Sequence, residues 1–307
     1  QAQSGDESRT QAAREDMVRK RRTETAKKPL GMPSSLEGSG SVRTAGIDLA
    51  SKPAKTAVCV IDWSPKKAGI KTWERSRWTD DRLIEELMSD PSIQRIGVDA
   101  PFGWPTEYVN AVSASSENGA WPKDGYTDDF GRFRATELNI KELIGATPLS
   151  SSLGNLSWVT RRCVRLLARQ ARGEDVKAAR LGEDCFVEVY PAASLKVWGI
   201  SPADLAEDPG GYKGETAKAV GRRRNLAEVL VKELESVVNM PTDFVERCEG
   251  KGGDDLVDAL IAALVARAMA RGRCEPIPDS VTPKQAKAEG WIRLPCGPRL
   301  QDDLMAT

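Results

Sequence analysis

The stretch "GIDLASKPAKTAVCVIDW", residues 46–63, decides the fold. It contains two apolar runs in succession, and the first of them encloses a single acid, Asp48. We predict a buried strand over 44–50, which contains Asp48, and a second strand over 55–63. An ionised carboxylate in a buried strand needs a partner, since the loss of hydration is costly. The rest of the sequence supplies candidates for that partner.

The segments that follow predict an α/β order. Residues 69–78 alternate as in a half-exposed strand, 80–90 have helical spacing, and 93–101 form a buried strand that Pro101 ends. Three strands, a helix and a fourth strand give a mixed α/β order. Further along, we predict a strand in the stretch 184–194 that Pro191 ends, and helices at 157–173, 221–237 and 254–272.

Composition excludes several classes of chemistry. The chain has 307 residues, 40% of them hydrophobic, which suffices for one large domain with its own core. No apolar run approaches the ~20 residues of a membrane span, and the first residues are polar, so we expect a cytoplasmic protein. The absence of histidine removes Ser-His and Cys-His pairs and His-ligated zinc. The six cysteines contain no C-x-x-C pair, which leaves carboxylates, lysines, hydroxyls or an oxygen-bound metal.

Two segments stand apart from the predicted core. Residues 1–41 lack aromatic residues and include the basic run "RKRRTETAKK", so we predict a disordered polar and basic tail followed by a single domain over 42–307. Residues 102–156 form a long insertion after the fourth strand. That insertion holds seven of the 17 aromatic residues, which suggests that it covers or binds something.

The acids of the predicted core favour a metal site. Asp48 lies in the first strand, Asp99 ends the fourth strand, and Glu188 lies in "FVEVYP". Asp255 and Asp258, three residues apart, share one face of the last long helix. Carboxylates gathered in an apolar setting repel one another unless hydrogen bonds or a cation compensate. Oxygen ligands alone favour Mg²⁺ or Mn²⁺ over zinc.

Each acid also has a structural interpretation. Asp254 follows two glycines at a helix start, where we favour a helix cap. Asp99 precedes Ala-Pro, a common turn position, and Glu188 could pair with a lysine. Asp48 has the weakest structural explanation of the set, because it is flanked by Ile47 and Leu49 in mid-strand.

Six motifs, taken in order, resemble domain-of-unknown-function family 429 (DUF429), regarded as predicted nucleases of the ribonuclease H-like superfamily. They are "GIDLA", "IGVDAPFGWP", "FRATE", "VEVYPAASLKVWG", "DDLVDALIAALVARA" and "EGWIRLP", and they span about residues 44–295. The resemblance implies a ribonuclease H-like fold, with a mixed five-stranded sheet flanked by helices. "DDLVDALIAAL" also resembles the last helix of Holliday-junction resolvases, where two acids three residues apart complete the metal site.

The resemblance also implies roles for the acids. Asp48 would bridge the metals from the central strand, Asp99 would act from the adjacent strand, and Asp258 with Asp255 would close the site from the helix. Glu188 matches an E-x-x-P motif of the family and would be either a ligand or an acid behind the ligands. All five acids are therefore candidate catalytic residues.

Basic residues are candidates for substrate phosphates. Arg161, Arg165, Arg169 and Arg172 recur at helical spacing, although an ordinary exposed face explains them as well. In the insertion, aromatic residues alternate with arginines, which suits base stacking but also a small separate core; these residues are Trp121, Tyr126, Phe130, Arg132, Phe133 and Arg134. Lys52, Lys213 and the run from Arg222 to Arg224 are further candidates. A net charge of zero provides no overall attraction for nucleic acid.

We therefore expect a metal-dependent nuclease that hydrolyses phosphodiester bonds of DNA or RNA with a metal-activated water. One alternative is an actin-like or sugar-kinase-like phosphotransferase. Its glycine-rich phosphate hairpins have no counterpart after Asp48, since the next glycine is Gly69. The other alternative is a non-catalytic interaction module that keeps the fold.

Overall fold

A computed structural model describes residues 42–64, 66–121, 130–145, 148–171, 179–200, 211–297 and 299–305. The predicted tail at 1–41, Tyr126 and Arg172 lie outside these ranges. No helix in the described ranges is both long enough and apolar enough to cross a membrane.

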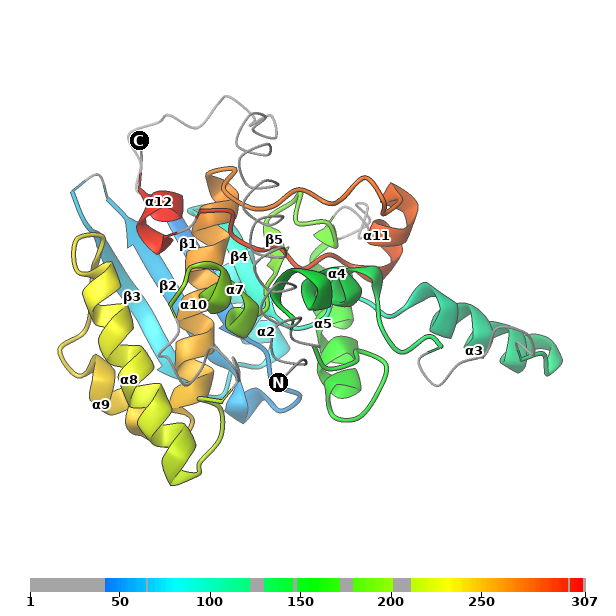
Figure 1. Cartoon of the computed structure of the whole chain (residues 1–307), viewed down its shortest axis with the longest axis horizontal. Coiled ribbons are helices and arrows are strands. Elements are labelled where there is room, and N and C mark those ends of the chain that lie inside the picture. Colours follow the sequence, from blue (N-terminus) through cyan, green and yellow to red (C-terminus); the bar gives the residue numbers. More distant parts are fainter. Residues whose placement is uncertain are drawn as a thin grey trace, which may run out of the picture. The chain divides into compact units, whose positions relative to one another are not determined.

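A six-stranded mixed sheet organises the described chain (Figure 1). Its order is β5-β4-β1-β2-β3-β6. The first three strands are antiparallel neighbours, whereas β4 pairs parallel with β1, β5 pairs parallel with β4, and β6 pairs parallel with β3. The strands are β1 Val42–Asp48, β2 Ala57–Trp63, β3 Ala68–Arg75, β4 Ile93–Asp99, β5 Phe186–Glu188 and β6 Val238–Asn239.

The predicted mixed α/β sheet is confirmed, but the predicted count of five strands is wrong. The sixth strand, β6, has two residues and pairs through Val238 and Asn239 with the start of β3. A two-residue strand has no alternation to detect, so periodicity could not reveal it.

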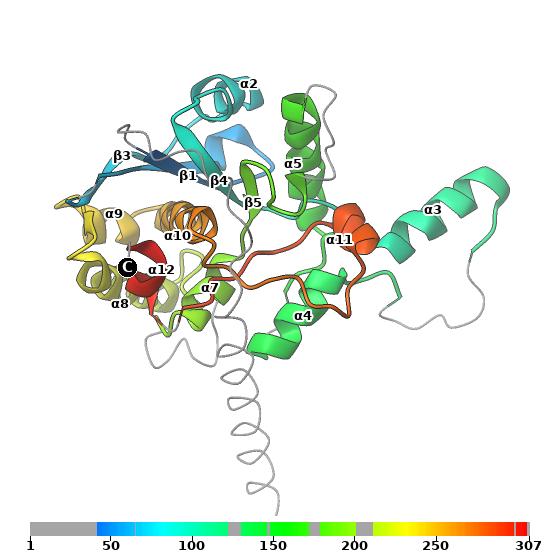
Figure 2. The same cartoon turned by 90° about the horizontal axis from the view of Figure 1, so that it is seen from above.

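Helices cover both faces of the sheet (Figure 2). On one face, α10 (Gly253–Ala270) packs across β1, β2 and β4 and shares an apolar core with four other helices. These are α7 Pro191–Val197, α8 Ala217–Leu234, α9 Phe244–Glu249 and α12 Leu300–Leu304. The opposite face carries α2 (Asp80–Leu83), its continuation η2 (Ile84–Met88), and α5 (Leu156–Ala171). Burial from both sides explains the uninterrupted runs without polar side chains at 45–47 in β1 and 96–98 in β4.

Two glycines bring α10 unusually close to the sheet. A Cβ on Gly46 would lie 2.0 Å from the carbonyl oxygen of Ala259, and one on Gly97 would lie 2.1 Å from that of Ala262. Real Cβ atoms do not approach a backbone this closely, so both strand positions require glycine. The helix backbone therefore lies directly against β1 and β4, and its second turn reaches the ends of these strands.

The segment predicted as a long insertion contains two helices that the sequence analysis did not predict. They are α3 (Thr106–Asn118) and α4 (Ala135–Ile144), and α11 (Pro283–Glu289) packs against both of them. A short 3-10 turn, η1 (Pro53–Lys55), connects β1 to β2. The loop between Asp48 and this turn lies at the same end of the sheet as the acids described next.

Candidate metal centre

Three carboxylates converge where β1, β4 and α10 meet. Asp48 is the last residue of β1, Asp99 is the last residue of β4, and Asp258 lies in the second turn of α10. One oxygen from each of the three side chains lies within 4.8 Å of the other two. We call this set the acid triad.

The strand register explains why the triad forms. Asp48 pairs directly with Asp99 in the parallel ladder, so both side chains point to the same face of the sheet. Gly46 and Gly97 lie two residues earlier on their strands and face the same way, toward α10. The close approach of the helix at these glycines therefore delivers Asp258 to the two strand acids.

Burial and mutual repulsion dominate the electrostatics of the triad. Burial, followed by the charges of Asp258 and Asp99, raises the pKa of Asp48 well above its usual range. Burial also raises the pKa of Asp99 to about 7, although Lys213 opposes the shift. The pKa of Asp258 is raised by burial too, against the effects of Lys213 and Tyr212. Three desolvated carboxyl groups that repel one another in their ionised forms favour the binding of a compensating cation.

A lysine and a tyrosine already contact the triad. The ammonium of Lys213 lies 2.7 Å from Asp258 Oδ2 and 3.6 Å from Asp99 Oδ2. The hydroxyl of Tyr212 donates a hydrogen bond of 2.5 Å to Asp258 Oδ1. The side chain of Lys213 is 41% exposed as a whole, but its ammonium is desolvated among the acids, which opposes its charged form. The charges of Asp258 and Asp99 outweigh this effect and raise the pKa of Lys213 well above the ordinary value. Lys213 was predicted as a phosphate contact, whereas nothing in the sequence analysis singled out Tyr212.

Hydrogen bonds from Arg223 and to Asp254 fix the backbone of the segment that carries Tyr212 and Lys213. Arg223, which is fully buried, donates from Nη1 to the carbonyl oxygens of Tyr212 (3.0 Å) and Gly214 (2.8 Å). The N–H of Gly214 donates to Asp254 Oδ2 at 2.8 Å. The predicted cap role of Asp254 is therefore wrong: the α10 N-cap is Gly252, and Asp254 anchors the neighbouring segment. Arg223 likewise has no exposed guanidinium to offer a phosphate.

Asp255 lies beside the triad rather than within it. Its Oδ2 accepts a short hydrogen bond from Arg75 Nε at the end of β3. Burial raises the pKa of Asp255, while Arg75 opposes the shift. The i, i+3 spacing correctly placed Asp255 near Asp258, but it gave no indication that an arginine from β3 would engage this acid.

Glu188 belongs to a different cluster, on the opposite face of the sheet. It pairs with Val98 in the β4–β5 ladder, one position before Asp99, so its side chain points away from the acid triad. Both of its oxygens accept from Arg134, Oε1 from Nη2 at 2.7 Å and Oε2 from Nη1 at 3.1 Å. Oε2 also accepts from the N–H of Phe102 at 3.1 Å.

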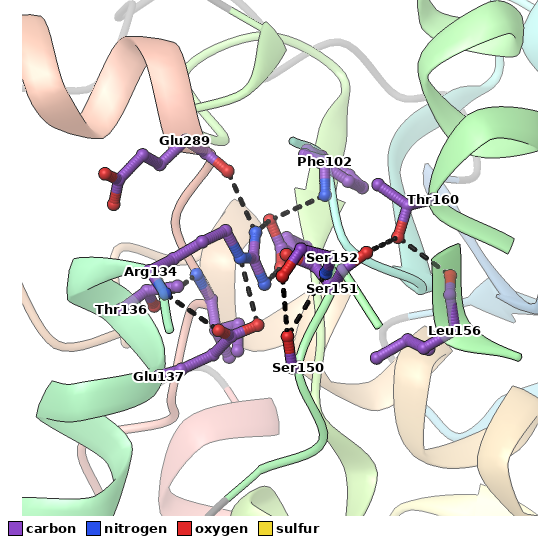
Figure 3. Close-up of polar contacts among 12 residues, drawn as sticks. Phe102, Arg134, Thr136, Glu137, Ser150, Ser151, Ser152, Leu156, Thr160 and Glu289 are labelled. Atoms are coloured by element: carbon purple, nitrogen blue, oxygen red, sulfur yellow. Dashed lines mark hydrogen bonds and ion pairs between the residues drawn. The ribbon is translucent and has the colours of Figure 1, made fainter. Parts of the chain in front are cut away.

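Arg134 is the centre of that second cluster (Figure 3). It is only 1% exposed, and besides Glu188 it contacts Glu137 Oε1 at 3.0 Å and the carbonyl oxygen of Glu289 at 2.9 Å. The Glu289 carboxylate accepts from the N–H groups of Thr106 and Ala135, at the starts of α3 and α4. Arg134 was predicted to contact substrate, but its burial leaves it no free donor surface, and it instead joins α4 and α11 to β5.

The remaining predicted phosphate contacts lie on the surface. Lys52 is exposed in the loop after Asp48. Arg161 is exposed on α5, and its guanidinium lies 4.9 Å from the ring centre of Trp158. Arg165 is 66% exposed but forms a short ion pair with Asp80 of α2. Arg162, between them, is buried and donates to the carbonyl oxygen of Ala50 at 2.5 Å, so α5 is attached to the loop that contains Lys52.

The donor set of the triad fits a hard divalent cation. All three groups are carboxylates, and Mg²⁺ and Mn²⁺ prefer oxygen ligands. The site lies at the ends of two rigid strands, backed by a helix that close packing holds in place. Such a setting fixes ligand positions better than a loop does.

Sequence comparison assigns the chain to a family. Residues 46–282 match the sequence profile described as "Protein of unknown function (DUF429)". No curated protein and no solved structure matches the chain significantly. The matched segment covers most of the chain and includes the whole acid triad together with Lys213. The chain therefore belongs to the DUF429 family.

Proposed function

We propose that the protein is a metal-dependent nuclease that hydrolyses phosphodiester bonds at the acid triad. The observation that carries the proposal is the convergence of Asp48, Asp99 and Asp258 to within 4.8 Å at the ends of two adjacent strands. A Mg²⁺ or Mn²⁺ ion bound there would activate a water molecule and stabilise the leaving oxygen.

The order of the elements supports a ribonuclease H-like fold with an insertion after β4. Three antiparallel strands come first, then a helix, and then β4 returns parallel to β1 on its other side. The acid of the first strand and that of β4 are neighbours, as the proposed fold requires. Asp258 comes from the long helix near the end of the chain, which is the place implied by the resemblance to resolvases.

The chain's own residues divide the work of such a reaction. The three acids would hold the cation, while the Arg223 and Asp254 contacts with Gly214 fix the backbone that carries Lys213 beside the triad. Lys52 is exposed in the loop after Asp48, and Arg161 is exposed on α5, which the hydrogen bond from Arg162 to Ala50 attaches to that loop. Both can therefore contact a polyanion that approaches the loop. The Trp158 ring, 59% exposed beside Arg161, suits stacking on an unpaired base.

The test is a cleavage assay with the purified chain in Mg²⁺ or Mn²⁺, on single-stranded and double-stranded DNA, RNA and a branched junction. We expect cleavage of at least one substrate, its loss in EDTA, and its loss in Asp48→Asn. The matched control is Asp243→Asn, which changes an exposed carboxylate outside the triad. Robust cleavage by a folded Asp48→Asn variant would refute the proposal.

A second candidate is a non-catalytic module, and one observation favours it. Lys213 and Tyr212 already engage both oxygens of Asp258, so the triad is partly neutralised within the chain itself. A chain that binds Mn²⁺ in calorimetry but cleaves none of the four substrates would support this candidate over the nuclease. A phosphotransferase is the weaker alternative, because no glycine follows Asp48 until Gly69; an ATP-induced thermal shift would revive it.

A further inference from the structure

We propose that Lys213 is a built-in counter-ion of the acid triad. Its ammonium lies against the acids when no divalent cation is bound there, and it moves away when one binds. This inference rests on the proposed function, since it concerns the same site. It adds a residue that sets the strength of metal binding and couples it to a movement of one side chain.

The ammonium of Lys213 contacts two acids of the triad. Nζ lies 2.7 Å from Asp258 Oδ2 and 3.6 Å from Asp99 Oδ2, so it contacts two of the three acids at once. Asp258 has no oxygen left without a partner, because the Tyr212 hydroxyl takes Oδ1. A cation entering among the three acids therefore meets a positive charge already in contact with two of its ligands.

Two cations cannot share these oxygens at low cost. A unit charge about 5 Å from a divalent ion opposes its binding by roughly tenfold even when the medium between them is as polar as water. The repulsion grows as the surroundings become drier. Either the metal binds weakly, or the ammonium moves away, and the second outcome depends on whether the side chain is free to move.

The surroundings of Lys213 allow that movement. Its side chain is 41% exposed, whereas the carboxylate of Asp258 is 3% exposed, so the lysine reaches the acids from the solvent side. Its backbone, in contrast, is fixed on both sides: Arg223 binds the carbonyl oxygens of Tyr212 and Gly214, and Asp254 binds the N–H of Gly214. The lysine therefore has an anchored backbone and a side chain that reaches solvent, which is what exchange with a metal requires.

The main test measures Mn²⁺ affinity by calorimetry, without reference to activity. Lys213→Met keeps the length of the side chain and removes its charge, so we expect Mn²⁺ to bind about tenfold more tightly than to the wild type. Lys213→Arg keeps the charge and should remain within about threefold of the wild type. Lys218→Met, on the exposed first turn of α8, is the matched control and should not change the affinity.

A second test uses the wild-type chain and does not depend on how a variant folds. Acetylation of lysines by an amine-reactive ester, mapped by mass spectrometry, should be slow at Lys213 in EDTA and several-fold faster in saturating Mn²⁺. Lys218 should react at the same rate in both conditions. Equal labelling of Lys213 with and without the metal would overturn the exchange.

The results separate this inference from the proposed function. If the wild type binds Mn²⁺ and Lys213→Met binds it no more tightly, the counter-ion role is refuted while the metal centre stands. If neither protein binds Mn²⁺, the metal centre itself is refuted, and the inference falls with it.

Discussion

Asp48 and Asp99 are directly opposite each other in the parallel pairing of β1 with β4, and each is the final residue of its strand. The same register places Gly46 opposite Gly97, two residues earlier on the same face. The pair of glycines admits the backbone of α10, and the pair of acids receives Asp258 from its second turn. Packing and the candidate site are therefore two consequences of one register.

The first prediction concerns these glycines. Gly46→Ala places a methyl group 2.0 Å from a backbone oxygen of α10, which cannot shift without moving the helix off the sheet. We expect a loss of about 3 kcal/mol or more in the free energy of unfolding, measured by urea denaturation. Gly69→Ala in β3 is the control, because its Cβ would meet nothing within 4 Å and should cost less than about 1 kcal/mol. Equal effects of the two substitutions would contradict the packing argument.

Much of this arrangement could be predicted from the sequence. The apolar runs and the proline stop located β1, β2 and β4, and the i, i+3 spacing located the acids of α10. The predicted mid-strand position of Asp48 is wrong, because β1 ends at this residue. That the strands of Asp48 and Asp99 are neighbours was implied by the family resemblance and is confirmed by their pairing. Asp258 could be predicted as a buried acid because the same face of its helix is apolar one turn further on.

The faces and the long-range partners could not be predicted. Glu188 also ends a strand, but it points away from the triad because it pairs with Val98 rather than with Asp99. The pairing register of a three-residue strand cannot be predicted from its own sequence, because the strand is too short to show an alternating pattern. Asp255 and Arg75 are 180 positions apart, and their contact depends on how β3 meets the start of α10. Tyr212 gave no signal, since a single tyrosine near a lysine has no characteristic spacing.

The second prediction separates Glu188 from the metal ligands. Glu188→Gln removes one of the two carboxylates that compensate buried Arg134, the other being Glu137, and it disturbs the two hydrogen bonds from the guanidinium, so we expect a loss of about 1–3 kcal/mol in the free energy of unfolding. Mn²⁺ affinity should remain within about threefold of the wild type, since the side chain lies on the other face. Arg224→Met, which removes exposed ion pairs with Glu228 and Glu249, is the control and should leave the free energy of unfolding nearly unchanged. A stable Glu188→Gln variant that no longer binds Mn²⁺ would show that Glu188 is a ligand.

The third prediction is a pH dependence of metal binding. The pKa of Asp99 is raised to about 7, so a proton competes with the cation for this acid below neutrality. Mn²⁺ affinity should therefore rise roughly tenfold between pH 6 and pH 8. Calorimetry at the two pH values checks this, and Asp243→Asn should retain the same dependence because that carboxylate is exposed outside the triad. An affinity that is constant over the range would mean that Asp99 is already ionised at pH 6.

The fourth prediction concerns stability without metal. Because the pKa of Asp99 is about 7 in the folded chain, against its ordinary value of 3.8, the folded state binds more protons than the unfolded state between these values. The contribution of Asp99 to stability therefore decreases as the pH rises through this window. We expect Asp99→Asn to be about 1–3 kcal/mol more stable than the wild type at pH 8 in EDTA, and to lose most of this advantage at pH 5. Urea denaturation at both pH values measures the difference, and a variant less stable at pH 8 would contradict the prediction.

The last prediction compares two acids of the same helix. Asp258 contributes an oxygen to the triad, whereas the carboxylate of Asp255 is engaged by Arg75. Asp258→Asn should weaken Mn²⁺ binding by about a hundredfold or more, because it removes a ligand. Asp255→Asn should weaken it only a few-fold, through the loss of a nearby negative charge. Both substitutions preserve shape and lie three residues apart on α10, so each serves as the control for the other once circular dichroism shows that both variants are folded. Equal losses in the two variants would mean that Arg75 releases Asp255 to the metal, and that the i, i+3 pair acts as a unit.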